Sequence, residues 1–90
     1  MKLSFDPAKR AKTLTERGLD FARADEVFAG VSITLSDERK DYGEPRRVSV
    51  GLLDDRVVVV VWTPRGGARR IISMRKANER EIARFAKALG

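Results

Sequence analysis

The chain has 90 residues, of which 42% are hydrophobic, and a formal net charge of +6. It contains no cysteine and no histidine, which excludes a disulfide scaffold, a thiolate metal site and the most common general base. Its apolar runs are shorter than the roughly 20 residues that a membrane-spanning helix needs, so we expect a single soluble, cytoplasmic domain over residues 1–90, without metal or cofactor.

The first third of the chain predicts a short strand and two helices. Residues 2–5 alternate weakly between polar and apolar, as a short strand does. Asp6 precedes a proline at the first helical position, which predicts a helix over Pro7–Arg17 that ends at Gly18. Asp20 then caps a second, short helix. The apolar stripe of this second helix comprises Phe21, Ala24, Val27 and Phe28.

Two alternating segments come next, and a polar loop separates them. We expect one strand over Val31–Leu35 and another over Arg47–Leu53. The Asp54–Asp55 pair after the second segment predicts a tight turn. The inward-facing side chains of the second strand are expected to be Val48, Val50 and Leu52.

The fold is expected to be organised around the hairpin that follows this turn. Val57–Trp62 is a β-branched apolar run typical of a central strand covered on both faces. Thr63–Ala68 contains Pro-Arg-Gly-Gly and predicts a connecting loop of about four to six residues. Arg69–Lys76 returns as the second arm.

The last segment predicts a helix, because Asn78 and Glu81 resemble a capping box and an apolar stripe follows them. The complete pattern predicts an α+β fold: a compact domain with an antiparallel β-sheet of about four to five strands. The N-terminal helices and the C-terminal helix are expected to pack on one face of this sheet, which leaves the other face partly open.

The positive charge is concentrated in the last part of the chain. Residues 1–55 hold ten Lys/Arg against eleven Asp/Glu, whereas residues 56–90 hold nine against two. The simplest interpretation is a solvated surface that favours solubility. The sharper interpretation is a face that binds a polyanion, for which nucleic acid is the most common partner.

Strand parity divides the second hairpin arm into two faces. One face is expected to carry Arg69, Ile71, Ser73 and Arg75, and the other Arg70, Ile72, Met74 and Lys76. Because Ile72 and Met74 suit a helix-covered core, we expect the hydroxyl and guanidinium of the first set on the open face, where they suit a phosphodiester. Arg65, at the predicted hairpin tip, would reach the substrate through a flexible glycine-rich loop.

Each candidate also has a purely structural interpretation. Glu81 is either a helix cap or a catalytic base, and Trp62 either closes the core or stacks on a base. Arg75 either binds substrate or pairs with a carboxylate of the 37–44 loop. The candidates that are otherwise plain solvated residues are Arg65, Arg69, Lys40 and Tyr42.

Four short motifs run along the chain in order. They are Phe5-Asp6-Pro7-x-Lys9, Gly18-x-x-Phe21 with Val27-Phe28, Asp41-Tyr42-Gly43-Glu44-x-Arg46, and Arg70-Ile71-Ile72-Ser73-Met74-Arg75-Lys76-Ala77-x-x-x-Glu81. With these motifs the chain resembles the BrnT family of toxin–antitoxin ribonucleases over nearly its whole length. It departs from the family pattern at Arg17, where members often carry a histidine, and at Phe85, where they often carry a tyrosine.

The resemblance implies a RelE-like fold and metal-independent cleavage of RNA that arrests growth. It also implies neutralisation by a BrnA-like ribbon-helix-helix antitoxin, whose complex with the toxin represses their own operon. Operator DNA is then a partner only through the antitoxin complex. The functional candidates carried over by position are Arg65, Arg70, Ser73, Arg75, Lys76 and Glu81, and all of them except Arg70 are expected to be catalytic. The RNA-binding candidates are Trp62, Arg69, Arg70, Lys40 and Tyr42.

RNA scission without metal requires deprotonation of the 2′-OH, stabilisation of the phosphorane charge and protonation of the 5′-oxygen. Arg75 and Arg65 suit the charge, and Lys76 or Glu81 suits the base if its neighbours shift its pKa. The alternatives are a basic nucleic-acid-binding module without chemistry and a module whose basic face docks an acidic partner.

Overall fold

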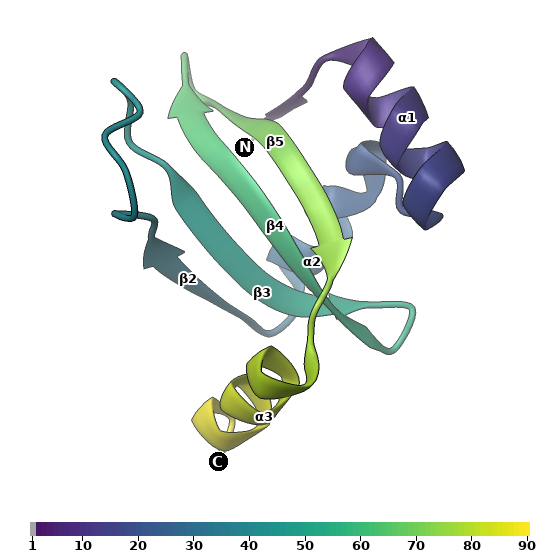
Figure 1. The fold of residues 1–90 in the computed structure, drawn as a ribbon, viewed down its shortest axis with the longest axis vertical. Coiled ribbons are helices and arrows are strands. Elements are labelled where there is room, and N and C mark those ends of the chain that lie inside the picture. The colour runs from purple at the N-terminus through teal and green to yellow at the C-terminus, as the bar shows by residue number, and fades with distance from the viewer. Residues whose placement is uncertain (1) are drawn as a thin grey trace.

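The computed structural model describes residues 2–90, which form a five-stranded sheet with helices on both sides (Figure 1). The strands are β1 (Lys2–Ser4), β2 (Ser32–Ser36), β3 (Arg47–Leu53), β4 (Arg56–Arg65) and β5 (Ala68–Lys76). The helices are α1 (Pro7–Arg17), the 3₁₀ turn η1 (Phe21–Arg23), α2 (Ala24–Ala29) and α3 (Glu79–Ala88). The α+β class is therefore confirmed.

The sheet has the strand order β1-β5-β4-β3-β2, so the valine-rich β4 is its centre as predicted. Three of the four pairings are antiparallel, between β2 and β3, β3 and β4, and β4 and β5. The exception is β1, which runs parallel to β5. The expectation of a wholly antiparallel sheet was wrong at this edge, because α1 and the rest of the chain intervene between the two strands.

The predicted caps and turns are confirmed. Asp6 accepts a hydrogen bond from the Ala8 amide and starts α1, and Gly18 ends that helix with a φ of 69°. The Asp54–Asp55 pair has φ values of 52° and 62°, which are those of a type I′ turn. Asn78 forms a complete capping box at the start of α3. These predictions are correct because each cap or turn is formed by contacts between residues only a few positions apart.

One face of the sheet packs against α1, η1 and α2. The buried core on this face comprises Leu19, Phe21, Ala24, Val27, Leu53, Val58, Val60, Trp62, Ile71 and Met74. The Trp62 indole lies edge-on to the Phe28 ring, with ring centroids 5.7 Å apart, and its Nε1 donates to Ser49 Oγ at 2.8 Å. Trp62 therefore closes this core and has its polar group satisfied.

The C-terminal helix lies on the opposite face. Phe85 of α3 is buried and lines a cleft together with Val59 and Val61, whose side chains alternate with the core-facing valines of β4. Figure 1 shows α3 in front of the lower end of the sheet and α2 behind it. The expectation that all helices cover one face was wrong, since β4 is apolar on both sides and needs cover on both.

Strand β3 alternates as predicted, but the face was assigned the wrong way round. Its core-facing residues are Ser49, Gly51 and Leu53, whereas Val48 and Val50 line the cleft and Leu52 is exposed. Ser49 is tolerated in the core because Thr34 and Trp62 both hydrogen-bond its hydroxyl. Hydrophobicity alone predicted the valines in the core, but a hydrogen-bonded serine and a glycine occupy the core positions instead.

The hairpin loop is shorter than predicted. It consists only of Gly66 and Gly67, with φ values of 57° and 78°, so β4 continues to Arg65 and β5 begins at Ala68. Two glycines at positive φ make a type I′ connection, which matches the twist of the flanking strands. Thr63, expected in the loop, is buried in β4 and donates its hydroxyl hydrogen to the Pro45 carbonyl.

Strand β5 contains an irregularity that changes its parity. Val61 pairs with Ser73 and Trp62 with Ile71, so Ile72 is an extra residue on β5. Met74 faces the core as predicted, but Ile71 takes the core position expected of Ile72. For the residues of β5 after Ile72 the predicted faces are correct, and for the residues before it they are reversed.

We predict that Gly51→Ala destabilises the protein by about 1–3 kcal/mol, through overpacking between β3 and α2. A Cβ at this position would lie 2.8 Å from Val27 Cγ1 and 3.2 Å from the Val31 carbonyl oxygen. Urea unfolding measures the loss. Gly30→Ala is the control, because a Cβ there meets only ordinary contacts of 3.6 Å or more. Equal stability of the two variants would contradict the close approach.

Candidate functional site

A cleft of about 640 Å³ opens on the face of the sheet that carries α3. Its floor consists of the cleft-facing side chains of four strands, and α3 forms one wall. The apolar residues that line it are Ile33, Leu35, Val48, Val50, Val59, Val61, Phe85 and Ala88. The register of the sheet places these strand residues side by side, since Val50 pairs with both Ile33 and Val59.

Arginine side chains stand around this apolar floor. Arg75 projects from β5, Arg84 from α3 and Arg39 from the loop after β2, and Ser73 lies one alternation before Arg75. Sequence reasoning had placed Ser73 and Arg75 on the open face, and the structure places both in the cleft. The lining also includes the carboxylates of Asp37, Glu38 and Glu81. A ligand with negatively charged oxygens suits the hydroxyl and the three guanidinium groups, and it would compete with these carboxylates for them.

Arg75 and Glu81 form a two-pronged ion pair inside the cleft. Arg75 Nη1 lies 2.7 Å from Glu81 Oε1, and Nη2 lies 2.8 Å from Oε2. Glu81 Oε1 also accepts from the Asn78 amide at 2.9 Å as part of the capping box. Glu81 is therefore a helix cap, as predicted, and it also fixes the guanidinium of Arg75. The expected partner of Arg75 in the 37–44 loop is replaced by this carboxylate.

These contacts set the charge state of the pair. The hydrogen bond from Arg75, followed by the Asn78 amide and the charges of Arg75 and Arg84, outweighs desolvation and lowers the pKa of Glu81 to about 2. The pKa of Arg75 is raised, chiefly by the same hydrogen bond. Glu81 is thus ionised at neutral pH and, while paired, is a weak base.

Arg39 is held at the mouth of the cleft by Asp37. The Asp37 carboxylate is buried and accepts from Arg39 Nε at 2.8 Å and Nη2 at 2.9 Å. The hydrogen bond from Arg39 lowers the pKa of Asp37, so the pair is charged. Arg39 and Arg75 both line the cleft, and the positive charge of Arg39 acts against the rise in the pKa of Arg75.

Other predicted residues lie away from this cleft. Arg65 pairs with Glu44 at 2.8 Å, and it lies six positions along the extended strand from Val59, the partner of Arg75 in the sheet. That separation is about 20 Å along β4. Lys76 is exposed and lines a second cavity on the helix-covered side. The structure therefore does not bring Arg65 or Lys76 to Arg75.

The bulge in β5 separates Arg69 from Arg75. Arg69 lies on the helix-covered face, where its Cζ is 4.1 Å from the Phe28 ring centroid and 5.2 Å from that of Trp62. Arg70 is half-buried and pairs with Thr63 in β4 and with Ser4 in β1. The assignment of Arg69 to the face of Ser73 was wrong, because the extra residue reverses the alternation.

The three aromatic and loop candidates also have structural contacts. Trp62 is enclosed in the core, so its ring is not an open platform for a base. Tyr42 lies between two cations, with Arg46 Cζ 3.8 Å and Lys40 Nζ 5.7 Å from its ring centroid. Lys40 and Tyr42 thus sit together on the loop before β3, outside the residues that line the cleft.

Sequence reasoning missed Arg39 and Arg84 as cleft residues. Arg84 is one of several cations in the last helix, and Arg39 lies among the charges of a polar loop. Helical spacing carried a partial signal for Arg84, since it lies three residues after Glu81 and therefore on the same side of α3. The position of Arg39 depends on the buried carboxylate of Asp37, for which the sequence gives no local pattern.

Two further features concern metal and membrane. Among residues 2–90, acidic side chains nowhere gather in a group of three or more that would hold a metal ion. Over the same residues, the helices are all too short or too polar to cross a bilayer.

The family model described as "Ribonuclease toxin, BrnT, of type II toxin-antitoxin system" matches residues 5–81 of the chain. This range begins after β1, includes α1 to β5 and ends at Glu81, in the first turn of α3. A comparison with curated proteins gave no match.

We predict that the contribution of Glu81 to stability disappears in acid. Because its folded pKa lies below the ordinary value of 4.5, the stabilisation is complete above that value and is lost as the pH falls towards about 2. Glu81→Gln should therefore lower the free energy of unfolding by about 1 kcal/mol at pH 7 and by much less at pH 2. Urea unfolding at several pH values measures this difference.

The matched control is Glu79→Gln, in the same helical turn. Glu79 is exposed and forms no ion pair with any of residues 2–90. A Glu81→Gln penalty that stays constant from pH 7 to pH 2 would contradict the ion pair.

Proposed function

Because the chain belongs to the BrnT family of ribonuclease toxins of type II toxin–antitoxin systems, we propose that it is a metal-independent endoribonuclease whose RNA substrate enters the cleft between β5 and α3. The observation that carries this proposal is the gathering of Arg39, Arg75 and Arg84 around one cavity. Arg75 and Arg39 are each held in position by a carboxylate. Together with Arg84 they would supply the electrostatic stabilisation that the pentavalent phosphorane needs, which is commonly the largest catalytic contribution.

Arg75 has the central role in this proposal. Its planar fork binds two phosphate oxygens as well as it binds the two carboxylate oxygens of Glu81. Ser73, on the same face of β5, adds a hydroxyl that donates to a further phosphate oxygen. The apolar floor around them lowers the local dielectric constant, which strengthens these contacts.

The entering phosphate competes with Glu81 for Arg75. While the ion pair is intact, the carboxylate is too weak a base to accept the 2′-OH proton efficiently. Once the phosphodiester takes over the guanidinium, Glu81 loses its main pKa-lowering contact and becomes a stronger base. We assign Glu81 two consecutive roles, first holding Arg75 in position and then accepting the 2′-OH proton. The 2′-oxygen then bonds to phosphorus, the P–O5′ bond breaks, and the departing 5′-oxygen takes a proton from solvent.

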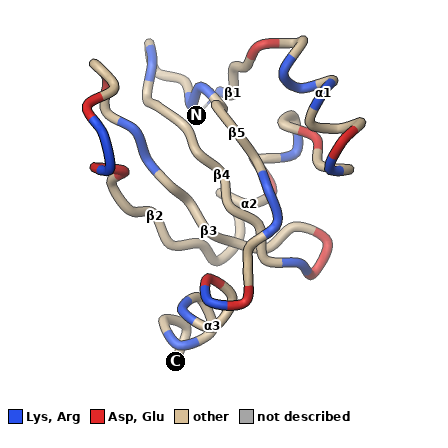
Figure 2. Tube along the Cα trace, viewed as in Figure 1, with Lys and Arg blue, Asp and Glu red and all other residues tan. Residues whose placement is uncertain are grey.

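The remaining candidates act outside this chemistry in our proposal. Arg65 and Arg70 lie near the other end of the β4–β5 hairpin, where they suit the flanking RNA rather than the scissile phosphate. Figure 2 shows lysine and arginine at both ends of β5. Lys40 and Tyr42, on the loop before β3, suit contacts with the same flanking RNA.

The antitoxin is the second partner in our proposal. A BrnA-like ribbon-helix-helix protein would neutralise the toxin by covering the cleft, and the complex would repress its own operon in the cytoplasm. The combination of an apolar floor and surrounding cations suits a segment of alternating apolar and acidic residues. The toxin itself would then touch operator DNA only through that complex.

We predict that induced expression of the wild type in bacteria arrests growth and degrades RNA, whereas Arg75→Ala does neither. Loss of one preorganised charge contact lowers cleavage by about 10²–10³-fold. Arg80→Ala is the control, since Arg80 is an exposed arginine of α3 that does not line the cleft. Growth curves and total-RNA electrophoresis give the readout.

Toxicity that persists in Arg75→Ala at wild-type level would remove this cleft from the mechanism. A folded wild type that leaves RNA intact and growth normal would favour the alternative of a binding module without chemistry.

We predict that purified wild-type protein cleaves RNA at the same rate with excess EDTA and with added Mg²⁺. The chemistry proposed for the cleft uses only guanidinium, hydroxyl and carboxylate groups. Gel-resolved cleavage of a labelled RNA oligonucleotide measures the rate. A rate that collapses in EDTA and returns with a divalent cation would contradict the metal-independent mechanism.

A further inference from the structure

A second cavity, of about 650 Å³, lies on the helix-covered side of the sheet. It is formed where the end of α1, the turn between β3 and β4 and the end of β5 meet. The charged residues that line it are Arg17, Asp20, Arg23, Asp54, Arg56 and Lys76. Four cations and two carboxylates give this lining a formal charge of +2, and the cleavage mechanism uses none of these residues.

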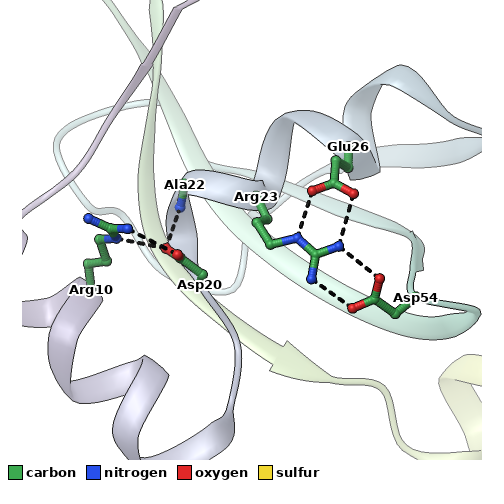
Figure 3. Close-up of polar contacts among 6 residues, drawn as sticks. All are labelled: Arg10, Asp20, Ala22, Arg23, Glu26 and Asp54. Atoms are coloured by element: carbon green, nitrogen blue, oxygen red, sulfur yellow. Dashed lines mark hydrogen bonds and ion pairs between the residues drawn. The ribbon is translucent and has the colours of Figure 1, made fainter.

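The two carboxylates are already occupied by other arginines (Figure 3). Asp20 accepts from Arg10 Nε at 2.7 Å and from the Ala22 amide at 2.9 Å. The Asp54 carboxylate accepts hydrogen bonds from Nη1 and Nη2 of Arg23, at 2.7 and 2.8 Å. The side-chain hydrogen bonds of both acids therefore come from arginines other than Arg17 and Arg56, although the charge of Asp54 still acts on Arg56.

Arg23 is also fully engaged. Its Nε and Nη2 donate to the Glu26 carboxylate at 2.7 and 3.0 Å, opposite the side on which it binds Asp54. Figure 3 shows this guanidinium held between the two carboxylates. Arg23 thus acts as a fixed part of the wall, and an incoming anion would have to displace two carboxylates to reach it.

Three cations of the lining remain available. Arg17, Arg56 and Lys76 are exposed, and none of them forms an ion pair with any of residues 2–90. Arg17 is positioned by one hydrogen bond, from Nη1 to the Met74 carbonyl at 2.9 Å, and its other donors are uncommitted. A guanidinium anchored through one nitrogen is preorganised to offer the rest of its fork to a ligand.

We propose that this second cavity binds a phosphate of the RNA backbone, outside the cleft in which the RNA is cut, through Arg17, Lys76 and Arg56. The inference rests on the proposed function, because it takes RNA as the polyanion. Lys76 directly follows Arg75 in β5, and consecutive strand residues face opposite sides. One end of β5 therefore presents a cation to the cleavage cleft and the next cation to the second cavity.

The test measures binding and is independent of cleavage. The probe is a fluorescein-labelled 2′-O-methyl RNA oligonucleotide, which lacks the 2′-OH nucleophile, and fluorescence anisotropy follows its binding. We expect Arg17→Gln/Lys76→Gln to bind it about 10-fold or more weakly than the wild type. The slope of log K against log salt concentration should fall by about 1 to 2, as expected for the loss of two phosphate contacts.

The matched control removes the same charge elsewhere. Arg80→Gln/Lys87→Gln takes two exposed cations from α3, neither of which lines either cavity, and should change affinity and salt slope much less. Arg17→Lys/Lys76→Arg retains both charges and should recover most of the binding. Urea unfolding of each variant separates a loss of the Arg17–Met74 hydrogen bond from a loss of phosphate contacts.

Several outcomes would overturn the inference. One is wild-type affinity and salt slope in Arg17→Gln/Lys76→Gln, and another is a wild type that does not bind the probe. If inorganic phosphate at the same concentration as the RNA displaced the RNA completely, the ligand of the cavity would be a free anion and not the RNA backbone. Tighter binding of poly-glutamate than of RNA with equal charge would assign it to an acidic protein.

A wild type that binds the probe through these residues but leaves natural RNA uncut would reject the proposed ribonuclease chemistry alone. Conversely, Arg17→Gln/Lys76→Gln could cleave RNA normally and bind the probe with wild-type affinity. That result would reject phosphate binding by the second cavity and leave the proposed ribonuclease chemistry intact. The two proposals therefore fail separately.

Discussion

Cover on both faces of β4 is the constraint on which the rest of the molecule depends. Val58 and Val60 face one side of the sheet, Val59 faces the other, and all three are buried. Helices α1 and α2 supply the first layer, and α3 supplies part of the second. Because α3 is short and covers only one end of that face, the remaining apolar floor stays open as the cleft. The active-site candidate is thus the part of the second face that the chain leaves uncovered.

Glu81 links the start of a helix to the charge of the cleft. The same carboxylate completes the capping box of α3 and holds the guanidinium of Arg75. The position of α3 and the orientation of Arg75 therefore depend on one side chain. A shift of α3 would move the Arg75 guanidinium, and a shift of Arg75 would disturb the start of α3. An RNA phosphate that binds Arg75 would also loosen the contact between β5 and α3. In the proposed mechanism, substrate binding would therefore be coupled to the position of the helix.

The net charge of +6 describes the surface less well than the pairing of its arginines does. Arg10 and Arg23 are committed to carboxylates and stiffen the helical layer. Arg69 is committed to two aromatic rings. The cations that remain without carboxylate partners include Arg17 and Lys76, and they lie beside the second cavity. The excess positive charge is thus concentrated at two candidate sites, because most other arginines form contacts within the protein.

The sequence by itself determined the elements whose signals are local. The caps at Asp6 and Asn78 and the central position of the valine strand required only neighbouring residues, and the motifs around Ser73 and Arg75 indicated the family. The tertiary structure decided which face each element presents. The bulge at Ile72 preserved Ser73 and Arg75 in the cleft but moved Arg69 away, and packing against Val27 put Gly51 in the core of β3. Arg39 and Arg84 lie at the cleft because the fold brings the loop after β2 and helix α3 to the same face of the sheet, which no local pattern encodes.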